Sequence, residues 1–169
     1  MKLREYIFTT FLLAIGLILH QITPGIFGGM KFDFLLIFMF VSILINVKLK
    51  NIILTALLGG LLSAMTTTFP GGQLPNILDK IVTCIVVFGL IRLFKNYYLN
   101  IFVVGLIGGI GTFVSGMTFL ISAAFIIGLP APMKVLVTGI VIPTTLINII
   151  GTVFIYRLVN KSLKLQYSQ

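Results

Sequence analysis

The sequence predicts an all-α integral membrane protein with six transmembrane helices. Of its 169 residues, 59% are hydrophobic and only 9% are charged, with a mean hydropathy of +1.20, whereas a soluble domain carries about 25% charged residues. A chain of this size cannot bury so much apolar surface in a water-soluble core. Because one span needs about 20 residues, we expect a single transmembrane domain over residues 1–169.

The first apolar run, Tyr6–Ile22, follows a short basic start, Met1–Glu5. The run is too long for the apolar core of a cleaved signal peptide, and the Thr-Pro-Gly sequence after it is a poor cleavage site. We therefore interpret it as the first span. The Gly/Pro-rich loop Thr23–Lys31 then leads into a rather short second span, Phe32–Asn46.

The middle of the chain is predicted to hold the third and fourth spans. A tight basic turn, Val47–Asn51, precedes the third span, Ile52–Thr68. A turn rich in proline and glycine, Phe69–Pro75, separates it from the fourth span, Asn76–Phe94. These residue types favour turns over helix continuation.

The segment between Lys95 and Lys134 contains no charged residue. Its apolar part, Tyr97–Ile127, is longer than one straight span needs but shorter than two spans with a turn. It is either one long tilted helix or a helix that ends near Gly116 and continues as an interfacial piece. Both interpretations keep the number of spans at six.

The last span is predicted over Val135–Leu158, after a loop at Gly128–Lys134. Pro143 lacks a backbone donor and is expected to kink this span. Asn160–Gln169 is predicted to be a polar, basic tail.

The basic residues favour a topology with both termini inside the cell. With six spans and an inner N-terminus, most lysines and arginines fall on the inner side, in accord with the positive-inside rule. The inner set is Lys2, Arg4, Lys48, Lys50, Arg92, Lys95, Arg157, Lys161 and Lys164, and the outer set is Lys31, Lys80 and Lys134. This distribution accounts for the net charge of +9 without a nucleic-acid partner; the expected surroundings are a lipid bilayer.

Motifs for catalysis, cofactors or metal binding are absent from the sequence. It has no P-loop, HExxH, CxxC or GxSxG motif, and it contains one histidine and three acids, too few for the usual catalytic or metal sets. Cys84 is the only cysteine and lies in an apolar run, which excludes an internal disulfide. We therefore expect no enzyme activity, no cofactor and no metal.

Two polar loops, Thr66–Lys80 and the shorter Thr23–Phe34, fall on the predicted outer face. Backbone groups freed by turns at membrane depth survive only where they face protein or a wet cavity, so these loops predict a lined pocket. The candidate substrate-binding residues are His20, Lys31, Asp33, Thr67, Phe69, Gln73, Asn76, Asp79, Lys80 and Asn148.

Asp33 and Asp79 are predicted in the first turns of the second and fourth spans. Each acid either stabilises the positive end of a helix dipole or binds an amine or hydroxyl of a substrate. Lys31 and Lys80 are interfacial anchors, partners of these acids, or binders of a carboxylate. Because adjacent residues on a helix point apart, we expect Asp79 to pair with Lys31 rather than with Lys80.

The other polar candidates each carry two interpretations. The threonines of Thr66–Thr68 bond their own helix backbone or line the pocket. Asn76 caps the fourth span or joins Gln73 as an amide ligand. His20 is a satisfied interfacial imidazole or a hydrogen-bonding ligand, and Asn148 bonds a neighbouring helix or contacts the pocket.

The chain resembles the bacterial tryptophan transport protein family in GGMKFDFLLIFMF (Gly28–Phe40), TTTFPGGQLPNILDK (Thr66–Lys80), GTFVSGMTFL (Gly111–Leu120) and the last span. The resemblance covers nearly the whole chain, and Thr66–Lys80 is its most specific part. The family is similar to the substrate-binding S components of energy-coupling-factor (ECF) vitamin uptake transporters, which have six helices and hold their substrate near the outer face. The resemblance therefore implies an S-component-like bundle and an energising partner, a transmembrane subunit with ATPases.

In that wider group, small residues of the first helix meet the energising subunit, often as Ala-x-x-x-Ala. The matching place here reads Thr10-x-x-x-Ala14, in which threonine is still small enough for close helix contact. We expect this pair either to dock the partner subunit or to pack within the chain.

A tryptophan site needs an acceptor for the ammonium, a donor for the carboxylate and an aromatic wall for the indole. The acceptor is Asp33 or Asp79, and the donor is Lys31, Lys80 or the amides at a helix start. The candidates for the wall are Phe27, Met30, Phe32 and Phe69.

We thus expect membrane uptake of tryptophan or a similar aromatic solute, with energy supplied by a partner. One alternative is a stand-alone, ion-coupled carrier for an aromatic or heterocyclic solute, although a deep acid for a proton relay is missing. A second alternative is a structural or assembly subunit of a membrane complex, whose loops bind another protein.

Overall fold

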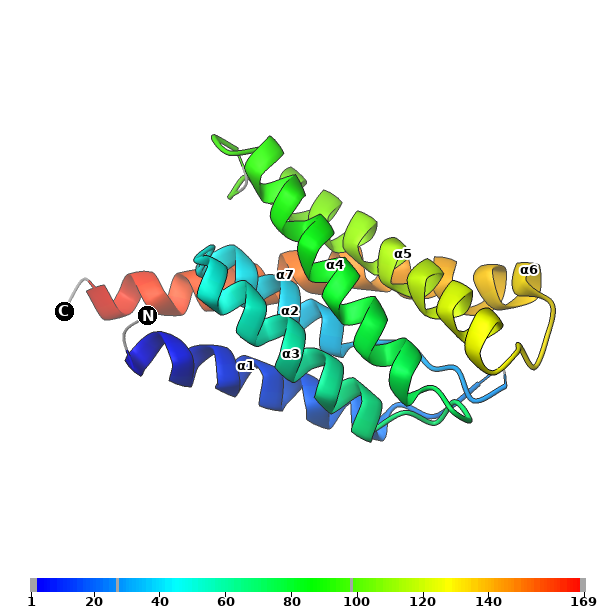
Figure 1. Cartoon of the computed structure of the whole chain (residues 1–169). Helices are drawn as coiled ribbons and strands as arrows, with labels where there is room; N and C mark the ends of the chain where they lie inside the picture. Colours follow the sequence, from blue (N-terminus) through cyan, green and yellow to red (C-terminus); the bar gives the residue numbers. More distant parts are fainter. Residues whose placement is uncertain (1–2, 27, 98, 168–169) are drawn as a thin grey trace.

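The computed structural model describes residues 3–26, 28–97 and 99–167, and every regular element within these ranges is a helix (Figure 1). The elements are α1 (Leu3–Ile22), α2 (Leu35–Ile45), α3 (Leu49–Met65), α4 (Gln73–Leu93), α5 (Ile101–Ile126), α6 (Met133–Leu136), the π-helical turn η1 (Val137–Val141) and α7 (Ile142–Tyr167). The last three follow one another directly and form one long rod. The predicted all-α class is therefore confirmed for the described residues.

The helices run back and forth along an elongated bundle (Figure 1). The start of α1, the end of α7 and the turn between α2 and α3 lie toward one end, which we call the terminal end. The connections at residues 23–34, 66–72 and 127–132 gather at the opposite end, which we call the loop end. Both polar loops singled out in the sequence therefore lie at one end of the molecule.

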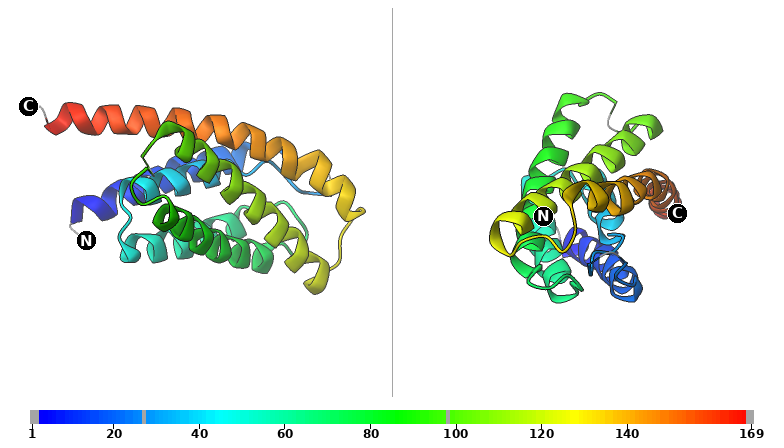
Figure 2. Two further views of the ribbon diagram at one scale, coloured as in Figure 1. Left: turned by 90° about the horizontal axis from the view of Figure 1, so that it is seen from above. Right: turned by 90° about the vertical axis from the view of Figure 1, so that its right-hand side faces the viewer.

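Helix α2 forms the centre of the packing, and every residue from Leu35 to Leu44 is buried. It contacts α1, α3, α4, α5 and α7, and the end-on view in Figure 2 shows the other helices arranged around the middle of the bundle. The main apolar core surrounds α2, and a second apolar cluster around Phe69, Phe119 and Leu136 lies near the loop end. The loop end thus has its own small core.

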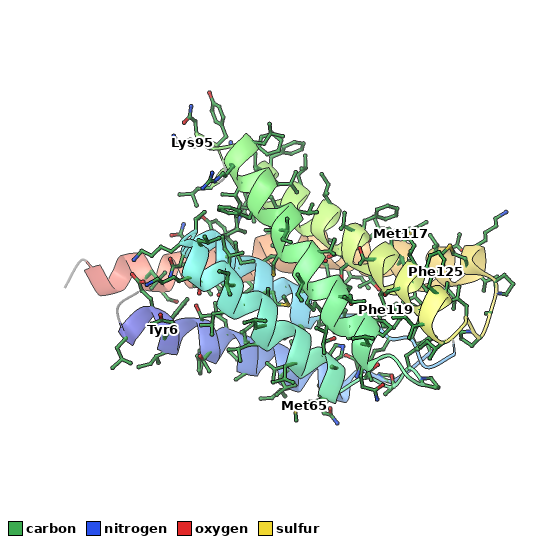
Figure 3. The ribbon with its side chains drawn as sticks, in the orientation of Figure 1. Tyr6, Met65, Lys95, Met117, Phe119 and Phe125 are labelled. Atoms are coloured by element: carbon green, nitrogen blue, oxygen red, sulfur yellow. The ribbon has the colours of Figure 1, made fainter. Side chains whose placement is uncertain are left out.

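Four helical segments are long and apolar enough to cross a membrane, namely Glu5–Ile22, Gln73–Leu93, Ile101–Ile126 and Met133–Leu163. Helices α2 and α3 are shorter, with 11 and 17 residues, and α2 reaches only about half of a bilayer core of about 30 Å. Large apolar side chains such as Phe125 project outward (Figure 3). An outer surface of this kind suits contact with lipid.

The predicted start of the second span at Phe32 is wrong, because residues 31–34 are not helical and α2 begins at Leu35. The carboxylate of Asp33 accepts a hydrogen bond from the backbone N–H of Leu35 at 3.1 Å. Such a local bond competes with helix and favours a helix start just after the acid. The segment before α2 is thereby free to form part of a site.

Helix α4 begins earlier than predicted, at Gln73 instead of Asn76. Pro75 falls in its first turn, where a missing N–H costs no helical hydrogen bond. The predictions that Asn76 caps the helix and that Asp79 lies in the first turn are therefore wrong, and Asp79 lies in the second turn.

In the second half of the chain, α5 is one continuous helix, so the single-long-helix interpretation is confirmed and an end near Gly116 is wrong. The irregularity expected at Pro143 takes the form of η1, in which the N–H of Ile142 bonds the carbonyl of Val137. Pro143 has no backbone N–H to donate, and the wider π-helical turn before it accommodates its ring without ending the helix. The predicted tail is helical through Tyr167, because no glycine or proline interrupts it.

Candidate functional site

A cavity of about 540 Å³, including its open mouth, lies at the loop end between the polar loops and the ends of α4, α5 and the last rod. The two loops contribute Gly29, Met30, Lys31, Asp33, Thr67, Thr68 and Phe69 to its lining. Asn76 and Asp79 of α4, Thr112 and Ser115 of α5, and Thr144 of α7 supply polar groups from the helices. The sequence therefore predicted correctly that the two polar loops share a pocket.

The polar side of the cavity is built on a buried ion cluster. The Nζ of Lys80 lies 2.7 Å from Oδ1 of Asp79 and 2.7 Å from Oδ2 of Asp33. Lys80 is fully buried and Asp79 is 1% exposed. A buried charge is tolerated only when it is paired and hydrogen-bonded, so Lys80 joins the loop before α2 to the second turn of α4.

The expected pairing of Lys31 with Asp79 is wrong. The Nζ of Lys31 instead donates to the backbone carbonyls of His20, at 2.6 Å, and Thr66, at 2.8 Å. Although adjacent residues on α4 start in different directions, the long side chain of Lys80 folds back to reach Asp79, because both charges are buried and each needs a partner. Lys31 ties the end of α1 to the end of α3.

The carboxylate of Asp33 has several partners besides Lys80. Its Oδ1 accepts the N–H of Leu35, and the Nε2 of His20 lies 3.8 Å from the same oxygen. Burial alone would raise the pKa of this carboxyl, but the charge of Lys80 and the hydrogen bonds outweigh burial and hold the pKa of Asp33 below its usual value. Asp33 is therefore an ionised structural anchor of the loop.

The imidazole of His20 is held by Thr66. The hydroxyl of Thr66 donates to the carbonyl of Leu62 at 2.7 Å, so its oxygen accepts from Nδ1 of His20, also at 2.7 Å. This pattern assigns the proton to Nδ1 and leaves Nε2 as an acceptor in the neutral ring. His20 lines the cavity.

Another part of the cavity lining is apolar. The rings of Phe69 and Phe119 meet edge to face, with centroids 5.2 Å apart and an interplanar angle of 87°, and Met30, Leu36 and Ile140 complete this wall. Figure 3 shows Phe119 near the loop end of α5. Such a wall suits a planar aromatic group, which gains from edge and face contacts.

Glycines allow the loops to close over the cavity. Gly29 adopts a φ of +85°, which a residue with a side chain rarely adopts, and a Cβ there would collide with the carbonyl of Thr68. The hydroxyl of Thr68 donates to the carbonyl of Gly29 at 2.7 Å. At Gly28, with a φ of +57°, an added Cβ would collide with the ring of Pro130 in the loop at residues 127–132.

The remaining candidate residues differ in whether they line the cavity. Asn76 lines the cavity, donates to the carbonyl of Gly72 and accepts from Ser63. Asn148 lies just behind the lining, where its amide donates to the carbonyl of Asp33 and to Thr112, and its Oδ1 is buried without a described hydrogen-bond partner. Gln73 is exposed outside the lining.

The residues Thr67, Phe69 and Asp79 line the cavity as well, whereas Phe27 lies outside the described residues. Thr10 and Ala14 are far from the site and exposed on α1, where the hydroxyl of Thr10 bonds the carbonyl of Tyr6 in its own helix. Their exposure leaves a partner surface available.

Sequence reasoning missed the hydroxyls that α5 and α7 contribute, Thr112, Ser115 and Thr144. Ser115 donates to Oδ1 of Asp79 at 2.9 Å. The available signal was the spacing of Thr112 and Ser115, because residues three apart share one face of a helix. Within the described residues, no group of three or more potential metal ligands occurs.

Comparisons with known proteins agree in pointing to one family. The family model described as tryptophan transporter TrpP matches residues 2–164. Three relatives carry the name probable tryptophan transport protein. The relative from Clostridium acetobutylicum is 44% identical over 169 residues, covering 100% of this chain and 99% of its own length.

The relative from Bacillus subtilis is 38% identical over 164 residues, which is 97% of this chain and 95% of the relative. The relative from Clostridium perfringens is 41% identical over an alignment of 162 residues, which covers 90% of this chain and 89% of the relative. No solved structure matches the chain.

Proposed function

The chain belongs to the tryptophan transporter TrpP family, and from this premise we propose that it takes up tryptophan across the cell membrane as a multi-pass protein. One observation supports this function most strongly, namely that the loop-end cavity joins buried acids and hydroxyls to an aromatic wall. Tryptophan is both zwitterionic and aromatic, so it needs both kinds of surface in one place.

The proposal includes the mode of transport. The chain acts as the substrate-binding subunit of an ECF-type transporter, a single domain of six helices with both termini inside and the loop end facing out. Two observations support this mode. Gly28–Phe40 and Thr66–Lys80 resemble the tryptophan transport protein family, which is similar to the S components, and residues of both segments border the same cavity. An energising transmembrane subunit with ATPases docks near Thr10 and Ala14 of α1.

A stand-alone, ion-coupled carrier is the second candidate, and the buried ion pair between Asp79 and Lys80 favours it. Ionisable residues inside membrane helices often belong to ion pathways. The two candidates differ in their energy source, which an uptake experiment separates.

The experiment measures uptake of radiolabelled tryptophan by tryptophan-requiring bacteria that lack their own tryptophan carriers. The chain is expressed alone and together with an energising module. The proposal predicts accumulation only with the module, and insensitivity to collapse of the proton and sodium gradients. Accumulation by the chain alone that is lost with the gradients would support the second candidate, and no uptake under any condition would contradict both.

A further inference from the structure

We propose that Asp79 binds the ammonium group of the substrate and Lys31 binds its carboxylate, whereas Asp33 and Lys80 hold the site in place without contacting the substrate. This inference rests on the proposed uptake of tryptophan and names the residues that make the site specific for a free amino acid. It separates two acids and two lysines that look equivalent in the sequence.

The acids differ in how much of their hydrogen-bonding capacity is already used. Asp33 uses both oxygens, Oδ1 for the N–H of Leu35 at 3.1 Å and Oδ2 for Lys80 at 2.7 Å. Asp79 concentrates its partners on Oδ1, which accepts from Lys80 at 2.7 Å and from Ser115 at 2.9 Å. Within the described residues, no donor reaches Oδ2 of Asp79, although Asp79 lines the cavity. An ammonium group is the donor that satisfies a buried carboxylate oxygen best.

The lysines differ in the same way. Lys80 has two carboxylate partners and is fully buried. Lys31 has only two neutral carbonyl partners, on His20 and Thr66, so one of its three N–H donors remains. Burial lowers the pKa of Lys31, and the charge of Asp33 offsets this effect only in part. An anion bound beside Lys31 would stabilise its ammonium charge, which its neutral carbonyl partners do only in part.

The formal charges of the two acids and two lysines sum to zero, but not every charge lies beside an opposite charge. Asp33 and Asp79 contribute two formal negative charges, and Lys31 and Lys80 contribute two formal positive charges. Lys80 pairs with both acids, so one negative charge is left without its own cation, and Asp79 has the oxygen without a described donor. Among the described residues, Lys31 has no carboxylate partner, and Asp79 and Lys31 both line the cavity. A zwitterion adds no net charge and satisfies both, whereas an amine or an acid alone satisfies only one.

The same geometry places the indole. With its charged groups held by Asp79 and Lys31, the side chain of the substrate faces the wall that contains Phe69 and Phe119. The ligand class is therefore a free α-amino acid with a large aromatic side chain, rather than any indole.

The test compares ligands on the full-length chain purified in detergent. L-tryptophan, tryptamine, which lacks the carboxylate, and indole-3-propionate, which lacks the ammonium, are titrated by calorimetry. The wild type is expected to bind tryptophan about 10- to 100-fold more tightly than either analogue, because each loses one charged hydrogen bond. Equal binding of tryptophan and indole-3-propionate by the wild type would overturn the assignment of Asp79 without any mutation.

Variants then assign each preference to its residue. Asp79→Asn is expected to lose the preference for tryptophan over indole-3-propionate and keep that over tryptamine, and Lys31→Met is expected to show the reverse. Lys134→Met, at an exposed lysine of the loop end, is expected to keep both.

The outcomes separate this inference from the proposed function. Binding of tryptophan with preferences that neither Asp79→Asn nor Lys31→Met changes would overturn the assignment and leave the function standing. Failure of the wild type to bind any of the three compounds would contradict the function and, with it, this assignment.

Discussion

Two buried polar clusters in this molecule differ in how completely their hydrogen-bonding groups are satisfied. At the terminal end, Thr9 donates to Oδ1 of Asn51 at 2.6 Å, and Asn51 donates to the carbonyls of Ser42 and Asn46 at 3.0 and 2.9 Å. We call this group the polar seam. At the loop end, the ion cluster of Asp33, Asp79 and Lys80 borders a cavity and leaves one oxygen of Asp79 without a described partner.

The difference indicates how the proposed binding site differs from a structural network. The polar seam contains neutral groups that satisfy one another between α1, α2 and α3, so it fixes the packing of these helices. The ion cluster buries charged groups, which costs desolvation energy. It also leaves one carboxylate oxygen of Asp79 without a described donor at the edge of the cavity. Burial of polar groups does not separate the two clusters, because both are buried. The feature that indicates a ligand site is an unsatisfied charged atom that faces a cavity.

The largest effect is expected for Lys80→Met, which removes the shared cation of the ion cluster. Two carboxylates then remain buried without a counter-charge, and we expect a loss of about 3–5 kcal/mol in the free energy of unfolding. Denaturant unfolding in detergent, followed by circular dichroism, measures it, with the exposed Lys134→Met as the control. A Lys80→Met variant as stable as the control would show that the cluster is not structural.

A smaller effect is expected at the loop glycines. Gly29→Ala places a side chain at a positive φ and against the carbonyl of Thr68, so we expect a loss of about 2–3 kcal/mol or an opened loop. Gly128→Ala is the matched control, because Gly128 also has a positive φ, +82°, but open space around it, and should cost only about 1–2 kcal/mol. Equal losses, with equal affinity for tryptophan, would contradict the closed contact between the loops.

The polar seam gives the complementary prediction. Thr9→Val keeps the side-chain volume but leaves Asn51 short of a donor, so we expect a loss of about 1–2 kcal/mol in unfolding free energy with no change in tryptophan affinity. Thr10→Val, on the exposed side of the same helix, should change stability by less than about 0.5 kcal/mol. A clear loss of affinity in Thr9→Val would mean that the two clusters are not independent.

The last prediction concerns the pH dependence of the contribution of Asp33 to stability. Its pKa is lower in the folded protein than in the unfolded chain, so its ionised form stabilises the fold above the unfolded pKa of about 4. This contribution is lost as the pH falls through the folded pKa. Unfolding of the wild type and Asp33→Asn between pH 7 and 3 should therefore converge on the acid side, and a constant difference between them would argue against this role.

Much of the fold could be predicted from the sequence, because apolar runs of sufficient length and the turns between them define helices in a membrane protein. The boundaries that failed did so for local reasons. Asp33 bonds the backbone two residues on and delays α2, and Pro75 is tolerated in the first turn of α4. Neither effect is visible in hydropathy.

The site was predicted as a region but not as a set of contacts. The polar composition of Thr23–Phe34 and Thr66–Lys80 placed it, yet the choice between Lys31 and Lys80 as partner of Asp79 was wrong, because helix geometry governs where a side chain starts and not where a flexible lysine ends. Ser115 lies in an uncharged span whose facing residues only the packed structure reveals.

In the proposed function, the loop-end cavity, and not another polar cluster, binds the substrate. The chain contains no tryptophan, so indole fluorescence reports the ligand alone in a titration with L-tryptophan. The account predicts a saturable blue shift of the ligand emission with the wild type and with Thr9→Val, as the indole enters an apolar wall, and at least tenfold weaker binding with a folded Asp79→Asn. No shift with the wild type, or an unchanged titration with Asp79→Asn, would contradict it.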